Sequence, residues 1–297
     1  MSTREEHPQQ DPPTDLVVSG PDQVTGPLAY HAEGPVWSPS WGGLRFVDMM
    51  AGDLLTLSED GTVRRLHVGT VAAFVRPRRS GGYVVGLERG LGLADDPDGS
   101  PTPLPPLWSD PGIRMNEGSC DPDGTLYAGS VAYDQAPGAG TLYRIDADGT
   151  VDVAQSGVTI SNGRDFSPDG TLAYYNDTAT GRTDVLDVRD GRLCRQRPLH
   201  VGDGEHPDGL CVDSAGNVWV ALYGAGTVRC YSPTGQVLAE VTLPARLVTA
   251  CTFGGEDLRD LYITTSRERL EDPEPGAGAL FRVRVSIPGK PVLPYAG

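Results

Sequence analysis

Four side chains with carboxylate or amide oxygens stand one or two positions before a glycine at widely separated points of the chain. Two carboxylates and two amide oxygens are the donors that a hard divalent cation such as Ca²⁺, Mg²⁺ or Mn²⁺ prefers. Without a cation, buried carboxylates would repel one another and be costly to desolvate. The simpler reading is that Asp-Gly and Asn-Gly merely turn the chain. The four residues are Glu33, Asn116, Asn162 and Asp208.

Glu33, Asn162 and Asp208 occupy the same place in an internal repeat, and Asn116 lies one position earlier in its unit. A glycine or alanine, an apolar run, a turn rich in Asp, Ser and Pro, and two or three further apolar runs recur with a period of about 40–46 residues. Sequences such as "PDG", "ADG" and "EDG" supply hairpin turns, because Asp and Gly tolerate positive φ. The six units begin near Gly34, Ala73, Gly118, Gly163, Gly209 and Ala250.

Short β-branched and aromatic runs, broken by 39 Gly and 26 Pro, predict an all-β fold. Four-stranded units of this length predict a six-bladed β-propeller, with a solenoid or two stacked sandwiches as the alternative. The sixth unit ends in "PGKPVLPYAG", which is a poor fourth strand. We therefore expect the N-terminal run "DLVVSG" at residues 15–20 to supply that strand and close the ring. The first residue of each innermost strand would then face the axis, which gathers the four oxygen donors at one mouth.

Composition excludes several classes of partner. The net charge of −16 argues against general nucleic-acid binding, and no apolar stretch is long enough to cross a bilayer. Residues 1–14 are polar and proline-rich, which predicts a flexible tail before a single propeller domain at 15–297. Five dispersed cysteines with no export signal predict reduced, mostly buried thiols and a cytoplasmic location. The oligomeric state is left open.

Four ordered segments resemble the gluconolactonase/regucalcin (senescence marker protein) family. They are "AEGPVWSPSWGGLRFVD", "RMNEGSCDPDGTLYAGS", "SNGRDFSPDGTLAYYND" and "HPDGLCVDSAGNVWVAL". Each motif alone is weak, but together they cover most of the chain in the right order. The resemblance implies a six-bladed propeller with one divalent metal at the channel mouth, which hydrolyses lactones of aldonic acids. It places Ca²⁺ first, with Mg²⁺, Mn²⁺ or Zn²⁺ as alternatives.

The resemblance also assigns roles to individual residues. It implies that Glu33, Asn162 and Asp208 bind the metal and that Asn116 contacts metal-bound water or substrate. It implies that Arg114 holds sugar hydroxyls. Where the family has a substrate-contacting glutamate, this chain has Asp134, preceded by Tyr133, which departs from the family pattern.

The chemistry expected of this set is metal-assisted attack of water on a lactone carbonyl. The cation would stabilise the developing oxyanion, and Asp208 would accept the proton. His31 and His206 flank the site in sequence; either could act in the pocket, although we expect both to face water. The run "RPRR" at residues 76–79 is read as a solvated basic turn.

Two other functions stay open. The Asp134 and Tyr133 departure allows the same site to act on another ester, a phosphotriester, or a substrate of biosynthetic cyclisation or isomerisation. A non-catalytic metal-binding propeller that presents its faces to a protein partner is the second alternative.

Overall fold

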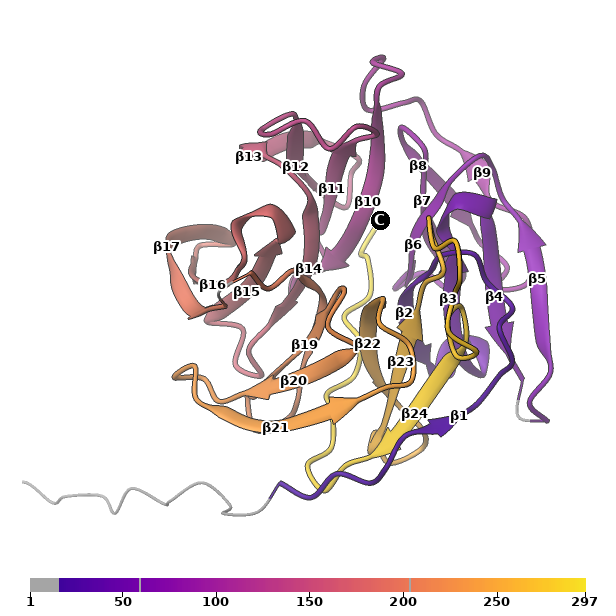
Figure 1. Ribbon diagram of the computed structural model, residues 1–297. Coiled ribbons are helices and arrows are strands. Elements are labelled where there is room, and N and C mark those ends of the chain that lie inside the picture. Colours follow the sequence, from indigo (N-terminus) through magenta and orange to yellow (C-terminus); the bar gives the residue numbers. More distant parts are fainter. Residues whose placement is uncertain (1–15, 59, 203) are drawn as a thin grey trace, which may run out of the picture.

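Six four-stranded antiparallel sheets surround a common centre in the computed structural model, which describes residues 16–58, 60–202 and 204–297 (Figure 1). Each sheet is one blade of a β-propeller, so the predicted all-β, six-bladed architecture is confirmed. Helical structure in the described residues consists of short 3₁₀ turns. They are η1 (Pro39–Trp41), η2 (Met49–Ala51) and η3 (Thr178–Thr180).

Each blade runs from an innermost strand at the channel to an outermost strand at the periphery. The innermost strands are β2 (Ala32–Ser38), β6 (Ala72–Pro77), β10 (Ile113–Cys120), β14 (Ser161–Phe166), β18 (Pro207–Val212) and β22 (Val248–Gly254). The second strands are β3 (Gly43–Asp48), β7 (Tyr83–Leu87), β11 (Leu126–Ala132), β15 (Leu172–Asp177), β19 (Val218–Leu222) and β23 (Asp260–Thr265). The third strands are β4 (Asp53–Leu57), β8 (Leu91–Ala94), β12 (Gly140–Ile145), β16 (Arg182–Arg189), β20 (Thr227–Tyr231) and β24 (Leu280–Arg284). The outermost strands are β5 (Val63–His67), β9 (Thr102–Pro103), β13 (Val151–Val158), β17 (Arg192–Val201), β21 (Val237–Thr242) and β1 (Asp22–Gln23).

The repeat in the sequence corresponds directly to the blades. All six residues at which the repeat units were predicted to begin lie in innermost strands. The core forms between blades, where the faces of neighbouring sheets bury aliphatic and aromatic side chains such as Phe74, Trp219 and Phe281. The periodic sequence therefore gives a ring because each blade buries its two faces against its neighbours.

The N-terminal segment closes the ring as expected, although the paired strand lies later than predicted. β1 is antiparallel to β24, with Asp22 opposite Arg282 and Gln23 opposite Phe281. Ahead of it, Val18 forms an isolated bridge with Val285. Hydrogen bonds to the last blade run from Val17 to Thr25, so the clasp includes part of the predicted run at residues 15–20 and continues beyond it. Residues 1–14, predicted as a flexible tail, and Asp15 lie outside the described residues.

The C-terminal segment after β24 crosses the channel at the end opposite the predicted site, and the C-terminus lies near the centre of the ring (Figure 1). Gly289 donates to the carbonyl of Leu258 in blade 6, and Lys290 Nζ lies 2.5 Å from Asp165 Oδ1 in blade 4. Tyr295 donates its backbone N–H to the carbonyl of Pro77 in blade 2. The segment therefore ties together blades that are not neighbours.

Tyr295 should be the main anchor of this segment. Its side chain is buried, and its hydroxyl donates to the carbonyl of Asp146 at 2.8 Å. We expect Tyr295→Ala to lower the free energy of unfolding by about 3–5 kcal/mol. The control Tyr295→Phe should lose about 1 kcal/mol, because it gives up one hydrogen bond and keeps the ring. Denaturant unfolding of both variants measures the difference, and equal stability of Tyr295→Ala and wild type would contradict this role.

The five cysteines are free, and four of them are buried. Cys211 and Cys251 approach to 3.6 Å between their Sγ atoms on the adjacent innermost strands β18 and β22. Burial raises the pKa of the Cys120 thiol to about 12, as expected for a core side chain. In the part of the chain that the structure describes, no helix has the length and apolar character needed to cross a membrane.

Candidate active site at the channel mouth

Each innermost strand has a register irregularity near its first residues. An extra residue in one strand leaves the ladder locally unpaired and redirects the side chains. The predicted donors Glu33, Asn116, Asn162 and Asp208 lie within or at the edge of these bulges, where the ladder is interrupted. The irregularities fall at residues 33–36, 72–75, 115–117, 161–164, 207–210 and 248–250.

Two of the glycines beside the donors are required by close approach of neighbouring strands. A Cβ at Gly163 would lie 2.4 Å from the backbone nitrogen of Leu210, and a Cβ at Gly209 would lie 2.4 Å from Cβ of Ala250. Both distances are far below van der Waals contact. The glycines therefore let the innermost strands converge, which brings the donors of different blades together.

The two carboxylates Glu33 and Asp208 are buried, and each lies close enough to other charged groups for their charges to shift its pKa. Glu33 and Asp208 are each 4 % exposed. Burial, followed by the nearby charge of Glu117, raises the pKa of Glu33 to about 8. Burial, followed by the charges of Glu33 and Glu117, raises the pKa of Asp208 well above its ordinary value. Oδ1 of Asp208 has no hydrogen-bond partner in the described part of the chain. Groups in this state are typical of functional sites.

Asn162 and Asp208 are positioned by two residues of blade 4 that sequence reasoning missed. Asn162 Nδ2 donates to Thr178 Oγ1 at 2.9 Å, and that hydroxyl donates to the carbonyl of Pro207 at 2.8 Å. Asn176, fully buried, donates to the backbone carbonyl of Asp208 at 2.6 Å. The signal in the sequence was the polar run "NDT", whose Asn176 and Asp177 end the strand β15.

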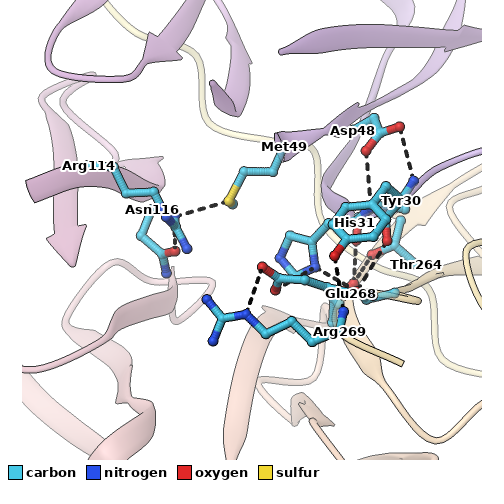
Figure 2. A network of polar contacts seen from close by, with 12 residues as sticks. Tyr30, His31, Asp48, Met49, Arg114, Asn116, Thr264, Glu268 and Arg269 are labelled. Atoms are coloured by element: carbon cyan, nitrogen blue, oxygen red, sulfur yellow. Dashed lines mark hydrogen bonds and ion pairs between the residues drawn. The ribbon is translucent and has the colours of Figure 1, made fainter. Parts of the chain in front are cut away.

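Arg114 and Asn116 form one wall of the mouth (Figure 2). Arg114 donates from Nη1 to Asn116 Oδ1 at 2.8 Å, to the carbonyl of Met115 and to Met49 Sδ. Asn116 Nδ2 donates to the carbonyl of Ser161 in the next blade. Nε and Nη2 of Arg114 make no hydrogen bond within the described residues, so one edge of the guanidinium is left for a ligand.

Tyr133 and Asp134, where the sequence departs from the family pattern, lie in different environments. Tyr133 is half-buried, lies 6.0 Å from the Arg114 guanidinium and donates its hydroxyl to Glu88 at 2.7 Å. Asp134 is exposed, and its carboxylate accepts the backbone N–H of Ala136. Tyr133 therefore lies against the predicted substrate contact Arg114, whereas the part of Asp134 in substrate binding stays a prediction.

The two histidines differ. His31 is buried, which corrects the expectation that it faces water; its Nδ1 lies 2.7 Å from Ser266 Oγ. Burial, followed by the charges of Arg114 and Arg269, lowers the pKa of His31 to about 3, so this imidazole is neutral. His206 is exposed on the loop before β18, and its role in substrate binding stays a prediction that His206→Ala can test.

A buried ion pair between Arg76 and Glu117 lies beside Glu33 and Asp208, and the sequence analysis did not predict it. Arg76, predicted to lie in a solvated turn, is 9 % exposed on β6, and its Nη2 lies 3.1 Å from Glu117 Oε1. Burial raises the pKa of Glu117, while Arg76 opposes this shift. Arg76 thereby partly offsets the negative charge that Glu117 adds to the cluster.

No group of three or more His, Cys, Asp or Glu side chains within residues 16–58, 60–202 and 204–297 is placed to hold a metal ion. The predicted set contains two such residues, Glu33 and Asp208, and is completed by the amide of Asn162. The metal set accordingly stays a prediction.

Comparisons with known proteins agree with this architecture. Residues 31–267 match the family described as the SMP-30/Gluconolactonase/LRE-like region. A 6-deoxy-6-sulfogluconolactonase of Pseudomonas putida is 37 % identical over 279 residues, which cover 89 % of this chain and 94 % of the relative. Regucalcin of Sus scrofa is 34 % identical over 285 residues, with the same coverage of 89 % and 94 %.

Solved structures give the same result. The structure of a calcium-binding protein, regucalcin, from Agrobacterium tumefaciens superposes with a TM-score of 0.87 at 26 % identity. The superposition covers 93 % of this chain and 97 % of that chain. The family match over residues 31–267 and the identity to these relatives show that the chain belongs to the SMP-30/gluconolactonase/LRE-like family.

Proposed function

We propose that this protein is a lactonase, a carboxylic ester hydrolase that opens a sugar-type lactone with the help of one divalent cation. The observation that carries the proposal is the buried pair Glu33 and Asp208, which lies at the same mouth as the free edge of Arg114. The family membership supports the reaction class, since relatives are named for lactone hydrolysis.

The residues present fit a divalent cation. Two buried carboxylates with raised pKa values and an unpartnered Oδ1 on Asp208 are costly unless a positive charge offsets them. Asn162 adds a neutral oxygen, since its Nδ2 is already used by Thr178. Glu33, Asn162 and Asp208 would hold the ion. An all-oxygen set favours Ca²⁺, which the name of the Agrobacterium relative also mentions, with Mg²⁺, Mn²⁺ or Zn²⁺ as alternatives.

The side chains divide the chemical work as follows. A divalent ion, when bound, supplies Lewis acidity and charge for a developing oxyanion. Asp208 accepts the proton from the attacking water at a carboxylate oxygen, and its Oδ1, which has no hydrogen-bond partner among the described residues, is free to do so. Arg114 and Asn116 orient the ring through hydrogen bonds, and Tyr133 packs beside Arg114 and limits access of water.

The test is a panel of substrates with chelated protein and with protein reloaded with each of the four cations. We expect aldonolactones to be hydrolysed only by the reloaded protein, followed as release of acid at constant pH. Negligible hydrolysis of all lactones, with turnover of a phosphotriester such as paraoxon, would replace the lactonase proposal by the phosphotriester alternative. Metal binding without either activity would favour a non-catalytic propeller.

A further inference from the structure

The connection between β23 and β24 in blade 6, residues 266–279, forms the wall of the mouth opposite Arg114. It follows β23 and contains Glu268 and Arg269 (Figure 2). The backbone N–H of Arg267 donates to the carbonyl of Tyr30, and that of Arg269 donates to the Tyr30 hydroxyl at 3.1 Å. The loop is therefore fixed to the segment that leads into Glu33.

Arg269 is held in an unusual backbone conformation. Its φ of 56° lies in the left-handed region that residues with a Cβ seldom adopt. Such a conformation is destabilising unless the surroundings enforce it, and it is found preferentially at ligand-binding and catalytic positions. The contacts with Tyr30 enforce it here, and they direct the side chain over the mouth rather than away from the ring.

The Arg269 guanidinium extends toward Arg114 and Asn116 across the mouth (Figure 2). Its side chain is 71 % exposed, and its contact with Glu268 joins Nε and Oε1 at 3.8 Å. That distance is too long for a hydrogen bond. The terminal nitrogens Nη1 and Nη2 make no hydrogen bond among the described residues either, so the guanidinium is available to a ligand. Arg114, on the other wall, also presents an unused edge. Burial is the main cause that lowers the pKa of Arg114 and of His31, and the charge of Arg269 lowers both further, in accord with its place beside them.

Two guanidinium groups facing one space are unexpected in a protein of net charge −16. Glu268 offsets one of the two charges. With a divalent ion between Glu33 and Asp208, the mouth then carries about one net positive charge, by a count of formal charges. The planar forks of arginine are suited to sulfonate, phosphate and carboxylate oxygens.

The geometry points to a substrate that carries an anionic substituent away from its lactone group, with Arg269 as the residue that binds this substituent and sets specificity for it. The inference rests on the proposed lactonase function. It assigns Arg269 to binding alone, so Arg269 should affect KM of the charged substrate more than kcat.

The experiment compares glucono-1,5-lactone with analogues that carry a 6-sulfonate, a 6-phosphate or a 6-carboxylate. For wild-type protein we expect kcat/KM to be higher for at least one charged lactone, and the three analogues identify which anion is preferred. Arg269→Ala should lower kcat/KM for that lactone about tenfold. It should change kcat/KM for the neutral lactone less than about twofold. Arg269→Lys should be intermediate, because it keeps the charge without the fork.

Arg267→Ala is the matched control, since Arg267 lies on the same loop with its Cδ beside Gly278. Arg267→Ala should leave kcat/KM unchanged for both the neutral and the charged lactone. An equal loss on neutral and charged lactones in Arg269→Ala, or no preference of the wild type for any charged lactone, would overturn the inference while leaving lactone hydrolysis intact.

If no lactone is hydrolysed, the proposed function fails, and binding still tests the inference. Calorimetry with gluconate and 6-phosphogluconate should then show tighter binding of the charged acid by wild type and loss of that difference in Arg269→Ala. Equal affinities of the wild type for gluconate and 6-phosphogluconate would reject the inference about Arg269.

Discussion

Replacement of Asp208 by asparagine is expected to lower kcat/KM for lactone hydrolysis by about 10²–10⁴-fold, the usual contribution of a positioned general base. The substitution keeps the shape of the side chain and removes both the proton acceptor and one negative charge. Because burial and Glu33 already penalise the ionised carboxylate, the metal-free variant should be at least as stable as wild type. Steady-state kinetics and thermal unfolding measure the two effects.

Asp95→Asn is the control for this substitution. Its carboxylate is 97 % exposed and pairs with Arg78, whose side chain is 12 % exposed and also donates to the carbonyls of Gly297 and Ala94. The substitution should change activity and stability little, because solvent screens the carboxylate and Arg78 keeps its other partners. Full activity in Asp208→Asn would remove this residue from the mechanism, and a large loss of stability would show that its charge is needed for folding.

Stability of the metal-free protein should fall as the pH rises from 5 to 8. The unfolded chain ionises Glu33 near its ordinary pKa, whereas the folded protein keeps the proton until about pH 8. The contribution of Glu33 is therefore fully present below the unfolded pKa and is lost as the pH passes through the folded value. A shift of this size corresponds to a decrease on the order of a few kcal/mol in the free energy of unfolding.

A bound divalent cation should reverse this dependence, because it favours the ionised carboxylates. The increase in Tm on adding Ca²⁺ to chelated protein should therefore be larger at pH 8 than at pH 5. Glu33→Gln should flatten the pH profile, while Glu240→Gln, on the outermost strand β21, should not. A metal-free Tm that is constant over this range, or an unchanged slope in Glu33→Gln, would contradict the electrostatic account.

The repeat was readable from the sequence because each blade has the same order of apolar runs and Asp-Gly turns. That order predicted all six innermost strands and the shared position of Glu33, Asn162 and Asp208. The N-terminal clasp was predicted only in part, because its regular strand β1 consists of Asp22 and Gln23, which carry no apolar signal in the sequence. Pairing was decided by β24, which is remote in sequence.

Bulges and tertiary partners were not predictable in the same way. A bulge depends on how neighbouring blades crowd the axis, so the sequence did not reveal that Asn116 lies in a bulge between Met115 and Glu117. The supports Thr178 and Asn176 act across a blade boundary. His31 and Arg76 were misassigned because a polar residue at a strand entry and an arginine in a basic run usually face solvent, whereas here buried partners hold them.

Anomalous diffraction from crystals soaked in Mn²⁺ tests the central claim most directly. The account predicts one strong peak at the channel mouth among the oxygens of Glu33, Asn162 and Asp208, and its loss in crystals of Asp208→Asn. A peak at another place in the protein, or an empty mouth at saturating Mn²⁺, would contradict it.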